Sequence, residues 1–443
     1  MQLVSQTAIE GRAGPTFAPL WPHSSQGVLT DITAFTQGQP YGAYRSLRET
    51  APVSWHEEPW GGPGFWAVTR YADVMAVNGD PTTFSSQRGG ILMTQGRVEE
   101  RHPLLYRASM DAMINLDAEP HLQLRREHMP YFTPAYLRSL TAKVAGEVTR
   151  LLDAIAETSK AGPIDMVEAF SSRLPLFTLC EILGVPEADR SKFLQWMHYL
   201  ELAQKLAQDR ATHGIEPSLE LMQFIQAFNE NVEAMFAYGR DMLEKRRREP
   251  QADLMSAIAN AEIDGVKLPD EFLDGSWLLI VFAGNDTTRN TLSGAMKLLT
   301  EFPTERDRLI AQPELLPNAA NEFIRMVSPV IYMRRTALRD ADIAGQKIAE
   351  GEKVIMYYGA ANRDPHMFEA PDQLDVARAN ADKHVAFGYG PHVCLGKRVA
   401  QIQLEEAYRQ ILARFPKASW TGDIEIAPNN FVHAISRLEV DFQ

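Results

Sequence analysis

Phe387-Gly-Tyr-Gly-Pro-His-Val-Cys-Leu-Gly396 is the stretch of sequence from which the fold can be inferred. Glycines lie on both sides of Cys394, and the residues from about Cys394 to Phe415 have the pattern of a helix. Glycine allows a backbone to approach a flat ligand closely, and a helix N-terminus offers unpaired N–H groups that stabilise a thiolate. The stretch therefore predicts a thiolate ligand at the start of a helix, next to a flat group.

The loop resembles the cysteine loop of the cytochrome P450 family, F-G-x-G-x-H-x-C-x-G, at every fixed position. This resemblance implies that Cys394 is the axial ligand of a haem iron and that Phe387, Gly388 and Gly396 border the haem. A thiolate ligand favours cleavage of the O–O bond on haem iron. Two alternatives are a zinc site, which needs about four ligands, and a nucleophilic cysteine with His392 as its base. A structural cysteine explains the residue but not the glycines around it.

A second motif, Ala283-Gly-Asn-Asp-Thr-Thr288, lies inside a helix predicted over Pro269–Leu299 and matches the family's A-G-x-[DE]-T-T. Gly284 in a helix interior costs ~1 kcal/mol relative to alanine, which favours a local reason such as room for O₂ beside the iron. Thr287 can hydrogen-bond backward in the helix and loosen a carbonyl. The resemblance implies that Ala283 and Gly284 border the haem, that Thr287 steadies the bound oxygen and that Asp286 relays protons. In isolation, a packing glycine and a surface acid would explain the same residues.

Glu322-Phe-Ile-Arg325 matches the family's E-x-x-R motif. Residues three apart share one helix face, so the two charges can pair. The resemblance adds Arg378, at the end of Pro371–Arg378, as the third member of a buried network that holds the cysteine loop. Leu374 stands where the family usually has an aromatic residue. The role implied for the three residues is structural.

Haem propionates need cationic partners when they are partly buried, and the resemblance nominates four residues. His121 and Arg125 have the i,i+4 spacing that places both on one helix face. Arg335 follows the E-x-x-R helix, but Arg334 beside it leaves the choice between the two arginines open. His392, inside the cysteine loop, is the fourth. Each residue taken alone is better explained as an ordinary surface cation, and it is the joint presence of all four that favours the haem.

The substrate pocket is predicted by family position to be lined mostly by apolar side chains, which favours a hydrophobic ligand. The alternative is that many of these residues belong to the core. The stretch Val354–Pro365 is similar to bacterial members that act on terpenes, alkyl chains, hydrocarbons or sterols. The residues expected in the pocket are Met93, Met113, Leu279, Phe282, Val330, Ile331, Met333, Phe431 and Val432.

The composition indicates an ordinary globular protein of 443 residues, with 45% hydrophobic and 23% charged residues. A net charge of −13 argues against a general nucleic-acid surface. Two cysteines, Cys180 in an apolar run and Cys394, give no disulfide framework and fit a reducing compartment. The first residues lack the pattern of a signal peptide, and the longest apolar run, Trp277–Ala283, is shorter than the ~20 residues of a membrane span. We expect a cytoplasmic monomer that does not insert into membranes.

Helical patterning dominates residues 119–330, with helices predicted over Tyr136–Ala156, Arg190–Asp209 and Leu219–Arg247. Short β segments are predicted at Val53–His56, at Gly64–Thr69 and within 333–358. The fold class is mainly α with a small β region, the cytochrome P450 fold. We expect one domain over residues 1–443, with residues 1–35 as an irregular arm.

Monooxygenation needs two electrons, and the sequence has no flavin motif and too few cysteines for an iron–sulfur cluster. The resemblance to soluble bacterial members implies a separate ferredoxin with its ferredoxin reductase. A basic patch of Arg125, Arg126, Lys397 and Arg398 would steer an acidic partner. The function implied is a monooxygenase with haem b (iron protoporphyrin IX) that inserts one oxygen atom of O₂ into a hydrophobic molecule. Alternatives are a peroxide-driven peroxygenase and a haem protein that only binds or senses a ligand.

Overall fold

The long helices form where apolar residues recur at three- and four-residue spacing, as in α5 (Pro134–Thr158), which buries Leu137, Leu140, Val144 and Val148 along one side. The computed structural model describes residues 27–58, 62–93, 102–213 and 218–443. Helices predominate within these ranges, as the sequence predicts.

The helices besides α5 alternate with short loops along the chain. Their bounds are α1 Tyr41–Thr50, α2 Tyr71–Gly79, α3 Pro103–Asp111, α4 Ala118–His128, α6 Arg173–Leu183, α7 Arg190–His213, α8 Leu219–Arg248, α9 Leu254–Ala259, α10 Asp270–Ala283, α11 Asp286–Glu301, α12 Pro303–Ala311, α13 Leu316–Val327, α14 Tyr358–Ala361 and α15 Lys397–Arg414. A 3₁₀ turn at Ile32–Phe35 precedes α1, and another at Gly390–His392 precedes α15.

The strands form one five-stranded sheet, one three-stranded sheet and two hairpins within the described residues. The five-stranded sheet has the order β1-β2-β10-β7-β3, in which β2 and β10 run parallel and the other neighbours antiparallel. The three-stranded sheet has the order β11-β12-β4. The bounds are β1 Val53–His56, β2 Phe65–Val68, β3 Phe84–Ser85, β4 Ile164–Asp165, β5 Glu262–Ile263, β6 Val266–Lys267, β7 Tyr332–Ala337, β8 Ala341–Ile343, β9 Gln346–Ile348, β10 Lys353–Tyr357, β11 Ser419–Ala427 and β12 Ala434–Asp441.

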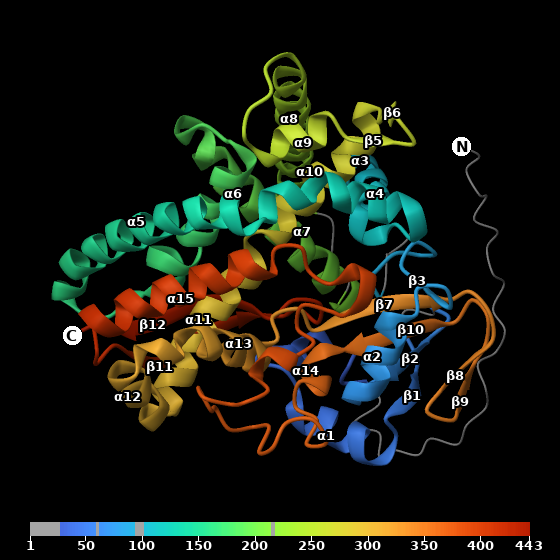
Figure 1. Cartoon of the computed structure of the whole chain (residues 1–443). Coiled ribbons are helices and arrows are strands. Elements are labelled where there is room, and N and C mark those ends of the chain that lie inside the picture. The colour runs from blue at the N-terminus through green and yellow to red at the C-terminus, as the bar shows by residue number, and fades with distance from the viewer. Residues whose placement is uncertain (1–26, 59–61, 94–101, 214–217) are drawn as a thin grey trace.

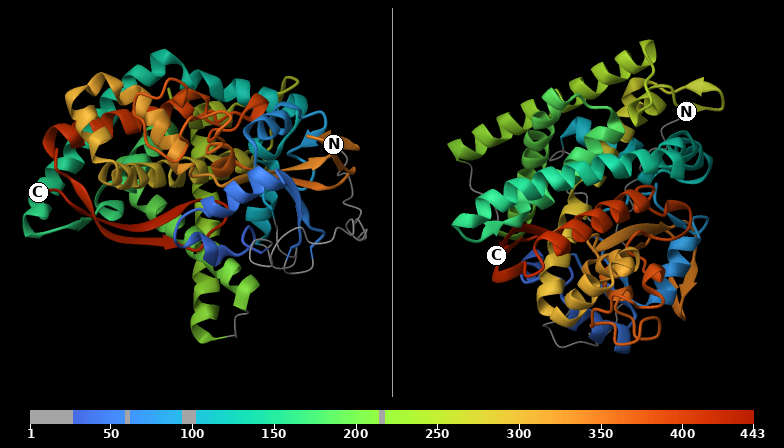
Figure 2. Two further views of the ribbon diagram at one scale, coloured as in Figure 1. Left: turned by 90° about the horizontal axis from the view of Figure 1, so that it is seen from below. Right: turned by 60° about the vertical axis from the view of Figure 1, so that its left-hand side comes forward.

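The helices gather on one side of the molecule and the five-stranded sheet on the other (Figure 1). Helix α5 lies alongside α15, and α11 lies beneath them, in contact with α13, α15 and the β11–β12 hairpin (Figure 2). The helical side contains the largest apolar core, and two smaller clusters cover the two faces of the sheet. Strand β2 is buried on both faces, which accounts for its continuous apolar sequence Phe65-Trp-Ala-Val68. The cysteine loop enters the molecule between the sheet and α15.

Several sequence predictions need correction. The helix predicted over Pro269–Leu299 is two helices, α10 and α11, because regular helix is interrupted at Gly284 and Asn285. The last helix begins at Lys397 rather than at Cys394, because Leu395 and Gly396 form a turn between Cys394 and the helix. The predicted helical region also contains β4 and the β5–β6 hairpin, whose two-residue strands are too short to produce a periodic pattern.

The predicted irregular arm over residues 1–35 lies mostly outside the described residues. Its last part, from residue 27, is described and is partly regular, because Ile32–Phe35 forms a 3₁₀ turn whose first residues are capped by the side chain of Asp31. The helices predicted at Tyr136, Arg190 and Leu219 are confirmed as α5, α7 and α8.

Candidate active site

The cysteine loop is held by its own backbone. The N–H of Cys394 donates to the carbonyl of Phe387 (2.8 Å), and the N–H of Gly388 donates to the carbonyl of Val385 (2.8 Å). Gly388 and Gly390 have φ of +72° and +71°, in the left-handed region that favours glycine. At Gly390 a β-carbon would also lie 2.7 Å from the carbonyl oxygen of Asn78 at the end of α2. Part of the glycine pattern is therefore required by the fold of the loop itself.

The thiol of Cys394 lies where a ligand can reach it. Its side chain is exposed, whereas burial within the surrounding protein raises the pKa of the thiol. The side chain is therefore accessible even though protein atoms surround it. The N–H groups of Gly396 and Lys397, and the guanidinium of Arg125, oppose the rise in the pKa. A metal cation on the sulfur would stabilise the thiolate further.

The four predicted propionate partners are brought together. The rings of His121 and His392 stack with their centres 4.0 Å apart. Burial is the main cause that lowers the pKa of His121 to about 4 and that of His392 to about 2, and the nearby charges of Arg125 and Arg335 lower both further. Asp117 is the carboxylate that faces this cluster, 3.9 Å from Nε2 of His392.

This cluster fits an anionic group. Burial is the main reason that both histidines are neutral, and the positive charges of Arg125 and Arg335 add to this effect. Arg125 makes no ion pair with a carboxylate among the described residues, and burial lowers its pKa. A pair of propionates would supply the missing negative charge. The accessible thiol and the buried cations are therefore the donor set that a haem requires.

The structure distinguishes the two neighbouring arginines of strand β7. Arg335 donates to Oδ1 of Asn78 (3.2 Å) and lies within the cation cluster. Arg334 points to the opposite face of the sheet, where it donates to the carbonyl of Leu92 (3.3 Å) and to Oγ1 of Thr336 (3.2 Å). Successive residues of a strand face opposite sides, so only Arg335 faces the site.

The acid–threonine pair lies at the break between α10 and α11. Thr287 donates its hydroxyl to the carbonyl of Ala283 (3.3 Å), the backward bond expected from the sequence. Asp286 lies 3.5 Å from the guanidinium of Arg289, and the amide of Asn285 donates to it (3.3 Å). At Gly284 a β-carbon would lie 2.8 Å from Leu179 of α6. A larger residue at position 284 would therefore need the Leu179 side chain to move, so packing is a second reason for glycine here.

Glu322, Arg325 and Arg378 form one buried network. Arg325 binds both carboxylate oxygens of Glu322, through Nε (2.7 Å) and a terminal nitrogen (2.8 Å). Arg378 donates from Nε to the same carboxylate (3.0 Å). The side chains of Glu322 and Arg325 are completely buried. Leu374 is buried as well, so an apolar residue fills the place of the usual aromatic.

The predicted pocket residues differ in accessibility. Phe282, the next-to-last residue of α10, is 41% exposed. Val330 and Val432 form a β-bridge, and the N–H of Ile331 donates to the carbonyl of Phe431 (2.8 Å), so two distant segments come together as predicted. Leu279, Val330, Met333, Phe431 and Val432 are partly exposed, whereas Met93, Met113 and Ile331 are buried in apolar clusters. The predicted lining of the pocket stays a prediction for each of them.

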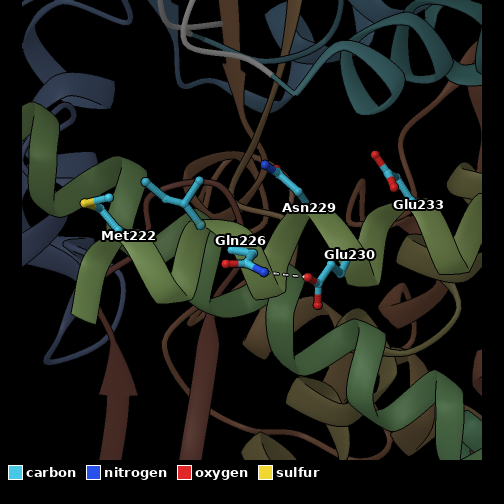
Figure 3. A pocket seen from close by; sticks show the side chains of 6 residues that line it. Met222, Gln226, Asn229, Glu230 and Glu233 are labelled. Carbon is cyan, nitrogen blue, oxygen red and sulfur yellow. Dashed lines mark hydrogen bonds between the residues drawn. The ribbon is translucent and has the colours of Figure 1, made fainter. Parts of the chain in front are cut away.

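A surface groove lies apart from this site. Its lining comes entirely from α8 and consists of Met222, Ile225, Gln226, Asn229, Glu230 and Glu233 (Figure 3). The amide of Gln226 donates to Glu230 along the helix (2.9 Å), so the groove is bordered by residues that bond to one another.

The predicted basic patch is smaller than its four residues suggest. Arg126 pairs with Glu119 (2.8 Å) and Arg398 with Glu405 (2.5 Å). Lys397 lies over the ring of Phe387, 5.7 Å from its centre. Arg125 is turned toward Cys394.

The site also contains residues that the sequence analysis missed. Asp117 accepts hydrogen bonds from the N–H groups of Ser86 (2.9 Å) and Gln87 (3.2 Å), and Ser86 contacts Nε2 of His392 (3.3 Å). Asp117 precedes His121 by four residues, one helical turn, and that spacing was the available sign of a shared face. The contacts of Ser86 join segments far apart in the sequence, and no local pattern predicts them.

The two alternative roles of Cys394 gain no support. Among the described residues, no three side chains of the histidine, cysteine, aspartate or glutamate type gather in a way that would hold a metal ion. His392 contacts Ser86 and the ring of His121, and no described hydrogen bond joins it to Cys394.

No helix within the described ranges has both the length and the apolar character needed to cross a membrane.

A mainly helical fold with an accessible cysteine near a cation cluster is what is expected of a haem-thiolate protein. The cytochrome P450 family pattern matches residues 94–432. The chain is 32% identical to linalool 8-monooxygenase of Pseudomonas putida, over 93% of this chain and 98% of that protein. It is also 32% identical to the methyl-branched lipid omega-hydroxylase of Mycobacterium bovis, over 98% of both chains.

A solved structure is similar over nearly its whole length. A cytochrome P450 of Mycobacterium marinum in complex with pseudoionone has a TM-score of 0.81 and 33% identity, over 96% of this chain and 100% of that chain. The chain therefore belongs to the cytochrome P450 family. It is a P450 monooxygenase, and its family implies a haem cofactor.

Proposed function

We propose that this monooxygenase uses haem b, bound through Cys394, to hydroxylate a hydrophobic terpene-, alkyl-, hydrocarbon- or sterol-like molecule with electrons from a separate ferredoxin. The observation on which the proposal mainly rests is the accessible thiol of Cys394, toward which the N–H groups of Gly396 and Lys397 are directed. Hydrogen bonds to a thiolate tune its donor strength and protect it from protonation.

The cofactor would be held at two places. Cys394 is the proposed ligand of the iron, and His121, Arg125, Arg335 and His392 are the proposed partners of the propionates. When bound, the haem supplies the redox centre at which O₂ is activated. Phe387, beside the cysteine, packs against the helical core and contacts Lys397 through its ring.

Proton delivery is assigned to Asp286 and Thr287. The hydroxyl of Thr287 is accessible and bonds to the carbonyl of Ala283, which takes that carbonyl out of regular helical bonding. Asp286 is partly exposed and directly precedes Thr287, so a proton can pass from solvent to this carboxylate and on to the hydroxyl. An intact acid–alcohol pair favours O₂, which requires protons, over peroxide as the oxidant.

The substrate class is inferred from the lining and from the relatives. The accessible side chains Leu279, Phe282, Val330, Met333 and Phe431 are apolar. Linalool and pseudoionone, in the names of two similar proteins, are branched chains with little polar surface. The methyl-branched lipid in the name of a third relative has the same character. We therefore propose a branched, flexible and mainly apolar substrate.

The test of the iron ligand compares the two cysteines of the chain. Cys394→Ser should abolish the thiolate-type absorption of the reduced, CO-bound protein. Cys180→Ala, which changes a buried cysteine of α6, should retain it. If Cys394→Ser retained the thiolate spectrum, or if the purified wild-type protein bound no haem, the proposal would fail.

The test of the reaction follows with candidate substrates. Linalool, pseudoionone, a linear alkane and a sterol are screened for a shift of the ferric spin state, and those that bind are incubated with ferredoxin, reductase and NADH. The expected result is a hydroxylated product with ferredoxin. Product with hydrogen peroxide alone would favour a peroxygenase, and a thiolate spectrum without any product would favour a protein that only binds its ligand.

A further inference from the structure

Asn362 connects two parts of the site. It follows α14 and is completely buried. Its carbonyl accepts a hydrogen bond from Arg325 (2.7 Å), and its side-chain Nδ2 donates to Oγ of Ser328 (2.8 Å). Its Oδ1 accepts from the backbone N–H of Val385 (2.8 Å). One side chain therefore contacts the end of α13 and the base of the cysteine loop.

The contact at Val385 continues to the cysteine through the backbone. The carbonyl of Val385 accepts from Gly388, and the carbonyl of Phe387 accepts from Cys394, both at 2.8 Å. Neither Val385 nor Phe387 has a polar side chain that could anchor this turn. Among the described residues, Oδ1 of Asn362 is the side-chain atom to which the N–H of Val385 is bound.

The other side of Asn362 rests on a rigid support. Arg325 is fixed by both oxygens of Glu322. The hydroxyl of Ser328 donates to the carbonyl of Arg325 (2.8 Å), and the side chain of Gln39 donates to the carbonyl of Ser328 (2.9 Å). The buried charges therefore fix the position of Asn362, and Asn362 fixes the position of Val385.

We propose that Asn362 is a positioning residue that transmits the geometry of the buried Glu322–Arg325–Arg378 network to the thiolate ligand. The inference rests on the proposed function, since it concerns Cys394 as the iron ligand. Asn362 touches neither the thiol nor the substrate side of the site. It acts through Val385 by setting the turn that presents the sulfur to the N–H groups of Gly396 and Lys397.

The physical reason is the cost of an unpaired buried amide. Without Oδ1, the N–H of Val385 would lie in the interior with no acceptor, and the backbone would shift to find one. A shift of the turn would misalign the N–H groups that face the sulfur. The thiolate would then be a stronger donor to the iron and would take up a proton more easily.

The experiment uses the haem-loaded protein and two spectroscopic readouts. In Asn362→Ala, the thiolate-type spectrum of the reduced CO complex should be lost roughly tenfold faster than in the wild type under mild denaturing conditions. The reduction potential of the ferric protein should become more negative, because weaker hydrogen bonds to the sulfur favour the oxidised iron. Circular dichroism measured in parallel reports whether the fold is still intact.

Three further variants separate positioning from general stability. Asn362→Asp keeps an acceptor for Val385 and should retain most of the wild-type spectrum and its lifetime. Ser328→Ala removes the second partner of the amide but not the bond to Val385, and should change the lifetime much less than Asn362→Ala. Asn318→Ala is the matched control, because the side-chain amide of Asn318 likewise makes two hydrogen bonds, donated to the carbonyls of Val376 (3.0 Å) and Arg378 (3.1 Å), without reaching the cysteine loop.

The outcomes distinguish this proposal from the proposed function. Equal effects of Asn318→Ala and Asn362→Ala on the thiolate lifetime would overturn the positioning role, as would an Asn362→Asp protein that behaves like Asn362→Ala. If Asn362→Ala fails to fold, the other two variants decide. A wild-type lifetime of the thiolate spectrum in both Asn362→Asp and Ser328→Ala supports the positioning role. A shortened lifetime in Asn362→Asp refutes it. A wild-type protein without a thiolate spectrum would instead refute Cys394 as the ligand.

Discussion

Replacing Glu322 by glutamine tests how strongly the buried charges stabilise the protein. The carboxylate accepts four hydrogen bonds, two from Arg325, one from Arg378 and one from the N–H of Asp375 (3.2 Å). Glutamine keeps one acceptor oxygen and places an NH₂ group against a guanidinium. Two buried arginines then lose their countercharge in a region without water to compensate.

The magnitude follows from the burial of this network. Breaking a buried ion pair by removing one partner costs about 3–5 kcal/mol, and the side chains of Glu322 and Arg325 have no exposed surface. An unfolding entropy of about 2.1 cal/mol/K per residue gives about 0.9 kcal/mol/K for a chain of 443 residues. The expected decrease in the melting temperature of Glu322→Gln is therefore about 3–5 °C.

The assay is thermal unfolding followed by circular dichroism, with Glu305→Gln as the control. Glu305 also accepts from a backbone N–H, that of Val376 (2.9 Å), and lies 3.7 Å from Arg308, but it is partly exposed. Its substitution should cost about 1 kcal/mol or less. The double variant Glu322→Gln/Arg378→Gln should lose less stability than the sum of the two single variants, because both belong to one network. A decrease for Glu322→Gln no larger than for Glu305→Gln would refute the reasoning.

Three other predictions concern proton delivery, the pH dependence of stability and electron transfer. Asp286→Asn should lower turnover about a hundredfold and raise the solvent isotope effect, and Thr287→Val should lower product formed per NADH, while the reduced CO spectrum of both variants stays as in the wild type. In the haem-free protein the pKa of His121 is lowered from 6.5 to about 4, so the unfolded state binds more protons between these values and stability falls as the pH decreases from 6.5 toward 4. Wild-type protein should lose about 2 kcal/mol more than His121→Gln between pH 7 and pH 5 in urea unfolding, and an equal loss in both would contradict this. Lys397→Glu should slow reduction by ferredoxin at low salt more than Lys383→Glu, as measured by stopped-flow absorbance, and equal rates would exclude Lys397 from the docking surface.

The sequence was most informative where chemistry requires residues close together in the chain. The cysteine loop, the acid–threonine pair and Glu322 with Arg325 are such local patterns, and their contacts are present in the structure. The local patterns did not reveal where regular helix ends, because the apolar periodicity of α10 and α11 continues across Gly284. The roles assigned to these residues stay predictions until the variants are measured.

Contacts between distant segments were beyond the reach of sequence patterns. The bond from Val385 to Asn362 joins a loop to another segment, and only the fold brings them together. The ion pairs of Arg126 with Glu119 and of Arg398 with Glu405 are different. In each pair the acidic partner lies seven residues away, two turns along the same helix. That spacing is visible in the sequence and would have reduced the predicted basic patch to Lys397 and Arg125.

The parallel pairing of β2 with β10 has a consequence for biosynthesis. Trp66 lies opposite Val354, so β2, which pairs early with β1, obtains its second neighbour only after most of the chain has been made. Until then, an apolar strand destined for burial on both faces has an unpaired edge in the nascent chain. We therefore expect newly made protein to depend on chaperones until the segment that contains Val354 emerges, and haem to be acquired only afterwards. Low growth temperature should increase the yield of haem-loaded protein, because slower aggregation gives this late pairing more time.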